Sequence, residues 1–364
     1  MDGDCAEDLM RTPYANLENP LWWKSLQGQG VVLYAWGSPR YLPIARAIRQ
    51  AGLSLVCNMD TSGMLGVLAG PVVYWGSLWR IAHGIGHTPV SWAWWMGRLV
   101  SSCTWSLVKT DPGRARHLRQ AHLIGAVSPV AWQHLRRVCR WYGGEALASR
   151  VHLIPHPVNP QMQYNGQRKR PLVVSVARWH REDWRQKNPR LLMQTLALVL
   201  QENPEVTGQV VGRMEEEIKT EFLRTVGPHR NRLILSGRIP NPDLVPLLQS
   251  AQISLCTSNH ESFHIASAEA LCCGCSVVAP DLPELPSLRW FTGESCGQLA
   301  EKSPERLAQG VTEELRLWRN HQRDASHIGS LWGGRLHADR VAERILHLLS
   351  SSSPSPLLFP SQRP

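Results

Sequence analysis

The hydrophobic and polar positions of this chain alternate between short apolar runs and longer stretches with helical spacing. Residues 30–36 and 53–59 are apolar runs typical of buried strands, and residues 41–52 between them have the spacing of a helix that Gly52 ends. The same order recurs farther along, at 123–128, 129–143 and 150–158. Strand and helix in alternation predict a parallel sheet with helices on both faces.

Residues 156–170 interrupt this order with prolines, a glycine and polar residues, which predicts an interdomain linker. Behind it a second series of α/β units begins, so the chain is expected to form two Rossmann-like domains. The expected division is an N-terminal domain at 1–164, a C-terminal domain at 165–330, a helix at 331–349 that packs back on the N-terminal domain, and a disordered Ser/Pro-rich tail at 350–364.

Composition agrees with two globular domains, because 364 residues exceed the usual size of one domain and 43% of them are apolar. Lys and Arg outnumber Asp and Glu by 39 to 29, a formal charge of +10. Such a surface suits nucleic acid, anionic lipid or a phosphorylated small molecule, and charge alone does not choose among them. No apolar run reaches the roughly 18 residues of a membrane span.

Residues 72–108 hold six of the sixteen tryptophans, together with Arg80 and Arg98. Tryptophan rings with interspersed cations are typical of a segment that lies on an anionic membrane surface. The same rings would equally serve to pack a helix onto its sheet, and the sequence leaves both interpretations open.

Nine cysteines and a polar, acidic start predict a cytoplasmic protein with free thiols. Cys272 and Cys275 have CxxC spacing, but no second pair or histidine pair accompanies them and the run around them is apolar. Core packing is the favoured interpretation, and no metal is expected.

Two glutamates stand eight residues apart in "ESFHIASAE". Glu261 follows a predicted strand, at the sheet edge where α/β folds bind ligands, and Glu269 lies in the helix after it. The start of that helix offers free N–H groups to a diphosphate, and the carboxylates suit sugar or ribose hydroxyls. The alternative is two solvent-exposed charges.

Two cations lie in the segment "VARWHREDWRQKNP". Arg178 is expected to end a strand and Lys187 to open the following helix. At the same sheet edge they would face a diphosphate and stabilise the charge on a leaving phosphate. Taken alone, they could equally be solvated basic residues.

Together these motifs resemble glycosyltransferase family 4, the retaining GT-B glycosyltransferases. The likeness covers about 150–300 and is carried by Glu-x7-Glu, "LIPHPVNP", "VVSVARW" with "QKNPRLLM", and "QVVGR". It implies a GT-B fold, in which two Rossmann-like domains with parallel sheets face a central cleft. It also implies an N-terminal acceptor-side domain and a C-terminal donor domain.

The resemblance assigns roles by position. Arg178 and Lys187 would bind the donor diphosphate and Glu261 the transferred sugar, and these three are the expected catalytic residues. Glu269 would bind ribose, with further donor contacts at Ser262, Phe263, His264, Ile265, Gly212 and Gly37. His264 departs from the family, which usually has glycine there; the histidine either alters the sugar pocket or is merely tolerated.

Acceptor-side candidates are His83 and Lys109, and the latter lies in a basic run that is equally well explained as a solvated helix face. The family mechanism is a front-face displacement in which the donor phosphate takes the acceptor proton, so neither a cofactor nor a metal is expected. The expected partners are a nucleotide-sugar donor, an unknown acceptor (lipid-linked or in envelope polysaccharide synthesis) and an anionic membrane contacted through 72–108, but no nucleic acid.

Two other functions remain open. One keeps the fold but changes the chemistry, to a GT-B epimerase or phosphorylase acting on related sugars. The other is a basic module that binds membrane or nucleic acid without catalysis, which would tolerate loss of Glu261 and Lys187.

Overall fold

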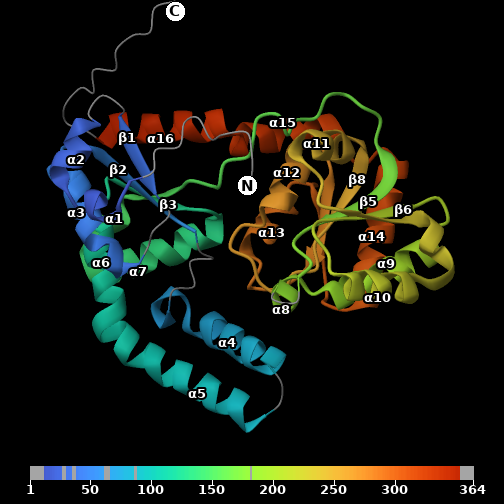
Figure 1. Cartoon of the computed structure of the whole chain (residues 1–364), viewed down its shortest axis with the longest axis horizontal. Coiled ribbons are helices and arrows are strands. Elements are labelled where there is room, and N and C mark those ends of the chain that lie inside the picture. The colour runs from blue at the N-terminus through green and yellow to red at the C-terminus, as the bar shows by residue number, and fades with distance from the viewer. Residues whose placement is uncertain are drawn as a thin grey trace, which may run out of the picture.

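A computed structural model of the chain describes residues 12–26, 30–34, 38–60, 66–85, 88–180 and 183–352. It contains two parallel sheets, one in each half of the chain, with helices around them (Figure 1). The predicted fold class, two Rossmann-like α/β domains, is confirmed.

The N-terminal sheet has the order β1-β2-β3-β4, all parallel. Its strands are β1 (Val31–Tyr34), β2 (Ser54–Met59), β3 (Leu123–Ala126) and β4 (Val151–Leu153). Apolar side chains fill both of its faces, so β2 and β3 are buried almost throughout. The helices of this half are α1 (Tyr14–Leu17), α2 (Pro20–Ser25), α3 (Leu42–Gln50), α4 (Pro71–Ile85), α5 (Pro89–Cys103), α6 (Asp111–Leu118) and α7 (Pro129–Ala148).

The C-terminal sheet has six parallel strands in the order β10-β9-β8-β5-β6-β7. Its strands are β5 (Arg170–Val176), β6 (Thr207–Val211), β7 (Leu233–Gly237), β8 (Ala251–Leu255), β9 (Ser276–Pro280) and β10 (Gly297–Ala300). The helices are α8 (Trp184–Lys187), α9 (Pro189–Glu202), α10 (Glu216–Val226), α11 (Asn241–Ser250), α12 (Ile265–Cys272), α13 (Pro286–Phe291), α14 (Pro304–Arg319), α15 (Ala325–Leu336) and α16 (Ala338–Ser352). The strand order reverses beside β5 and β8, which places the loops after them at a ligand-binding edge.

The last helix returns to the first domain. Helix α16 packs Val341, Ile345 and Leu349, spaced four residues apart, against the N-terminal sheet. In Figure 1 helix α16 lies over the N-terminal sheet, although the two are far apart in the sequence. Helix α16, which follows the C-terminal domain in the chain, therefore contributes to the core of the N-terminal domain.

Helices α4 and α5 form an antiparallel pair, here called the tryptophan hairpin, that projects away from the N-terminal sheet (Figure 1). Trp79, Trp92 and Trp95 contact one another edge to face inside it. Other apolar side chains of the hairpin and the turn after it are exposed, namely Val72, Val90, Met96, Val100, Trp105 and Val108. Within the described residues, no helix is long and apolar enough to span a bilayer.

The cysteines "CCGC" lie in the core. Cys272, Cys273 and Cys275 are fully buried, and the Cys275 thiol donates to the backbone oxygens of Leu248 and Ala251. Among the described residues, no group of three or more His, Cys, Asp or Glu side chains could hold a metal ion.

Candidate functional site

A pocket of about 570 Å³ lies where the loops at the carboxyl ends of β5, β6, β7 and β8 meet the N-terminal domain. Most of its lining comes from the C-terminal domain, and Asp60 and His156 enter from across the cleft. The lining residues are Asp60, His156, Val176, Ala177, Arg178, Lys187, Val211, Gly212, Arg238, Ile239, Asn241, Leu244, Glu261, Ser262, Phe263, His264, Ile265, Ala266 and Glu269.

The pocket gathers three kinds of group around one space. The cations Arg178 and Lys187 come from the β5–α9 connection, and the carboxylates Glu261 and Glu269 come from the loop before α12 and from α12 itself. The free N–H groups at the start of α12 also lie at this pocket, because His264, Ile265 and Ala266 line it. This grouping fits a ligand with a diphosphate and hydroxyl groups.

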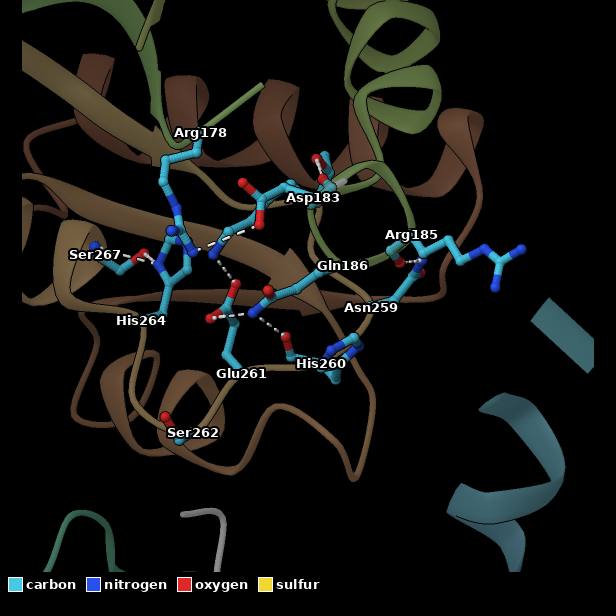
Figure 2. A network of polar contacts seen from close by, with 12 residues as sticks. Arg178, Asp183, Arg185, Gln186, Asn259, His260, Glu261, Ser262, His264 and Ser267 are labelled. Atoms are coloured by element: carbon cyan, nitrogen blue, oxygen red, sulfur yellow. Dashed lines mark hydrogen bonds and ion pairs between the residues drawn. The ribbon is translucent and has the colours of Figure 1, made fainter. Parts of the chain in front are cut away.

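Glu261 is held as a buried carboxylate. Its Oε1 lies 2.5 Å from Lys187 Nζ, and its Oε2 accepts a hydrogen bond from Gln186 at 3.2 Å (Figure 2). Burial by itself would raise the pKa of this carboxyl, but the charges of His264 and Lys187 outweigh it and hold that pKa below its usual value. Since His264 is uncharged at neutral pH, Lys187 is the effective countercharge there.

Lys187 was expected to open the long helix that follows β5, and this expectation is wrong. It is the last residue of the one-turn helix α8. Helix α9 starts two residues later, at Pro189, because Asn188 takes a left-handed conformation and its side chain caps Leu191 N–H. This break turns the end of α8 toward Glu261.

Arg178 reaches the pocket with a largely free side chain. It lies two residues beyond the end of β5, its side chain is 72% exposed, and its Nη2 lies 3.5 Å from Asp183 Oδ1 (Figure 2). At this distance and exposure the ion pair is weak. The guanidinium is therefore available for a phosphate.

Gly212 supplies the close turn after β6. Its φ is +132°, and a Cβ there would lie 1.7 Å from the carbonyl oxygen of Ala177. Only glycine fits such a contact. The bare backbone lets the β5 and β6 loops approach each other on one side of the pocket.

His264 adopts a conformation that glycine normally fills. Its φ and ψ are 59° and 72°, in the left-handed region. Its Nδ1 accepts a hydrogen bond from the Ser267 backbone N–H at 3.3 Å, and this bond caps the start of α12 (Figure 2). The same Nδ1 lies 2.7 Å from Ser267 Oγ. Burial lowers the pKa of the imidazole to about 4, so the ring is neutral and carries its proton on Nε2.

Glu269 lies one turn into α12 with no charged partner in the described part of the chain. Burial raises the pKa of its carboxyl to about 7. A ligand hydroxyl that donates to this group would favour the ionised form.

The other residues expected to contact the donor, Ser262, Phe263 and Ile265, differ in the partners and the exposure of their side chains. Ser262 donates its hydroxyl to Asp60 Oδ1 at 2.8 Å. The Phe263 ring is buried against His156 and Phe291, which leaves its backbone for a ligand, whereas Ile265 is 43% exposed at the pocket.

The expected N-terminal contacts are less defined. Gly37 lies outside the described residues. His83 belongs to α4, and its side chain is outside what the structure describes. Lys109 is not a lining residue of the pocket and places its Nζ 4.3 Å from the centre of the Trp105 ring.

Sequence reasoning missed Asp60, His156 and Arg238. The His156 ring donates from Nε2 to Asp60 Oδ1 at 2.9 Å, and this bond chiefly holds the pKa of the Asp60 carboxyl below its usual value. Asp60 directly follows strand β2, which the apolar run 53–59 predicted, so its place after that run was an available signal. Arg238 directly follows β7, whose end the sequence did not mark.

Solved structures of other proteins share this architecture. The chain superposes on Anabaena HepE solved with UDP and glucose (TM-score 0.57, 16% identity, 91% of this chain and 81% of that one). It also matches the lipopolysaccharide outer core galactosyltransferase WaaB (TM-score 0.55, 14% identity, 92% and 78%). The fold is therefore that of the GT-B proteins.

Residues 170–316, within the C-terminal half of the chain, match the family model "Glycosyl transferases group 1". Two curated relatives agree: the tRNA-queuosine alpha-mannosyltransferase of Drosophila melanogaster (28% identity over 111 residues) and the GDP-mannose:cellobiosyl-diphosphopolyprenol alpha-mannosyltransferase of Xanthomonas campestris (26% over 145 residues). These matches cover 30% and 38% of this chain, and 28% and 38% of the relatives.

Proposed function

We propose that the protein is a retaining glycosyltransferase that moves a sugar from a nucleotide-sugar donor to an acceptor held by the N-terminal domain. One observation carries the proposal: Arg178, Lys187, Glu261 and Glu269 line one pocket with the start of α12. The cations and helix dipole would stabilise the leaving diphosphate, Glu261 would orient the sugar and Glu269 the ribose. The donor phosphate would then accept the proton of the attacking hydroxyl on the same face.

The donor to test first is GDP-mannose, because both curated relatives are named alpha-mannosyltransferases and one name includes GDP-mannose. UDP-glucose is the comparison, since HepE was solved with UDP and glucose. A thermal-shift screen of GDP-, UDP- and ADP-sugars identifies the donor by the rise in melting temperature that binding causes. Nuclear magnetic resonance of the product then reports whether the anomeric configuration is retained, and whether an epimerised donor forms instead.

The matched variants are Arg178→Ala and Arg190→Ala. Both guanidinium side chains are about 70% exposed, but only Arg178 lines the pocket. We expect the first variant to lose transfer and the second to keep it. If Arg178→Ala and Arg190→Ala transfer sugar at the same rate, the proposed site is wrong.

For the acceptor, we infer a lipid-linked molecule at an anionic membrane surface. Support comes from the tryptophan hairpin and the turn after it, which expose Val72, Val90, Trp92 and Trp105. The Lys109 ammonium lies over the Trp105 ring. Pelleting with phosphatidylglycerol vesicles at low salt is the expected result, reduced by Trp92→Ser with Trp105→Ser. A protein that stays in the supernatant would remove this proposal.

RNA is the second candidate acceptor. Residues 12–153 contain 14 Lys and Arg but four Asp and Glu, a net charge of +10 that equals the net charge of the whole chain. The Drosophila relative is named for a modified tRNA nucleoside. The expectation that no nucleic acid binds thus remains a prediction, and a filter-binding titration with total tRNA at two salt concentrations tests it.

A further inference from the structure

The loop that carries Glu261 is held by the N-terminal domain at two points. Directly next to Glu261, the Ser262 hydroxyl donates to Asp60 Oδ1 at 2.8 Å. Behind it, the Glu261 N–H donates at 3.0 Å to the carbonyl oxygen of Glu284. Glu284 is itself bound by Arg80 of α4, through Nε and Nη2 at 2.7 and 2.6 Å from Oε1. One contact of the donor-side loop with the opposite domain is therefore direct, and the other passes through Glu284.

The Arg80–Glu284 contact is more than a surface ion pair. The Glu284 side chain is 5% exposed, and within the described part of the chain Arg80 is the only cation in ion-pair contact with it. A buried carboxylate is stable only when a cation or hydrogen bonds compensate it. The cation in direct contact comes from the other domain, whereas Lys302 of the same domain interacts with Glu284 only through its charge, without an ion-pair contact. Separation of the domains would therefore remove the nearest compensating charge.

We propose that Arg80 is a positioning residue for Glu261, acting across the cleft through Glu284. This inference rests on the function proposed above, in which Glu261 holds the transferred sugar. The route is short: α4 carries Arg80, Arg80 fixes the Glu284 side chain, and the Glu284 carbonyl fixes the Glu261 backbone. Because α4 is half of the tryptophan hairpin, these contacts connect the hairpin to the donor-side carboxylate.

Loss of Arg80 should therefore affect the rate of sugar transfer but not the binding of the nucleotide. Arg178, Lys187 and the start of α12 bind the diphosphate without Arg80, so nucleotide affinity should be nearly unchanged in its absence. Glu261, however, would lose its fixed backbone, and a misplaced sugar lowers the transfer rate by roughly tenfold to a hundredfold.

Amide hydrogen exchange on the full chain tests the positioning without needing catalysis. We expect Arg80→Met to speed exchange in residues 258–264 by about tenfold while the strands of the C-terminal sheet stay protected. The matched control is Arg98→Ala, in the same hairpin, whose guanidinium contacts Trp94 within its own domain. Unchanged exchange at 258–264 in Arg80→Met, or equal acceleration throughout the domain, would overturn the proposal.

Kinetics with the donor identified above provides the second test. Arg80→Met should lower kcat with little change in the Kd of the free nucleoside diphosphate, and Arg80→Lys should recover part of kcat. The charge-swapped double variant Arg80→Glu with Glu284→Arg should have a higher kcat than either Arg80→Glu or Glu284→Arg alone, since the ion pair is restored. If the wild-type protein transfers no sugar, the proposed function fails, whereas the exchange experiment still decides the role of Arg80.

Discussion

Lys187 and Glu261 form a nearly buried ion pair at the centre of the pocket, with Nζ 2.5 Å from Oε1 and the two side chains 12% and 8% exposed. One comes from the end of α8 and the other from the loop after β8, so the pair ties two neighbouring loops together. In the proposed function, a diphosphate that enters the pocket would meet a lysine that is already oriented. The pair thus has a structural role in addition to its proposed catalytic one.

Removing the lysine should expose that structural role. Lys187→Met leaves an uncompensated buried carboxylate, and we expect the free energy of unfolding to fall by about 3 kcal/mol. Lys187→Met combined with Glu261→Leu should recover most of this loss but no transfer activity. Urea unfolding measures the stability of both; equal stability of Lys187→Met and wild type would contradict the prediction.

Glu269 should make stability depend on pH in a direction opposite to that of ordinary carboxylates. Its pKa is about 7 in the folded chain and near 4.5 when unfolded. The folded state therefore binds the extra proton between these values, and the stability that this proton provides, about 3 kcal/mol, is lost as pH rises from about 4.5 through 7. Comparing the melting temperatures of wild type and Glu269→Gln across this range isolates the effect. A constant difference between the two proteins would disprove it.

The same carboxyl should also couple nucleotide binding to pH. A ribose hydroxyl donates to the ionised form, so affinity for the nucleoside diphosphate should rise as pH passes 7 and then level off. In Glu269→Gln this rise should be absent. Calorimetric titrations at pH 6 and pH 8 measure it, and an unchanged pH dependence in the variant would count against the ribose role.

His264 invites a comparison of two substitutions. His264→Ala keeps the left-handed φ of 59° but loses the cap on Ser267, and we expect a cost of about 1–2 kcal/mol. His264→Gly also loses the cap but removes the strain, so its stability should stay within about 1 kcal/mol of wild type. Thermal unfolding ranks the two, and a glycine variant less stable than the alanine variant would refute the interpretation. Donor preference in the glycine variant shows which sugars the imidazole selects.

Gly212 should tolerate no side chain. Gly212→Ala would place a methyl group 1.7 Å from the Ala177 carbonyl oxygen at a φ of +132°, and a loss of at least about 3 kcal/mol is expected. Gly166→Ala is the matched control, because its φ is also positive but its added methyl group meets no atom within 4 Å. Similar losses in both would mean that backbone strain alone, and not the contact with Ala177, decides the effect.

Much of the fold follows from local pattern. The strands and helices of the C-terminal half follow from apolar runs separated by turn residues, and such runs predict two Rossmann-like domains. The GT-B architecture was implied by the family resemblance. Strand β10 was not predicted, since its four residues are all half-buried at the sheet edge and lack a continuous apolar signal. The position of Lys187 at the end of α8 was also missed, because a left-handed Asn188 leaves no clear mark on the apolar pattern.

The sequence by itself determined which groups were candidates for binding a nucleotide sugar: two cations after one strand, two carboxylates before and within one helix, and a glycine after a strand. These features are local, since each depends on the few residues that set a turn or a helix end. Only the tertiary structure decided that Lys187 neutralises Glu261, that Asp60 and His156 face the same pocket, and that Arg80 compensates the buried charge of Glu284. Those contacts join residues between 74 and 204 positions apart, and such pairings follow from how strands and domains assemble rather than from any short stretch of chain.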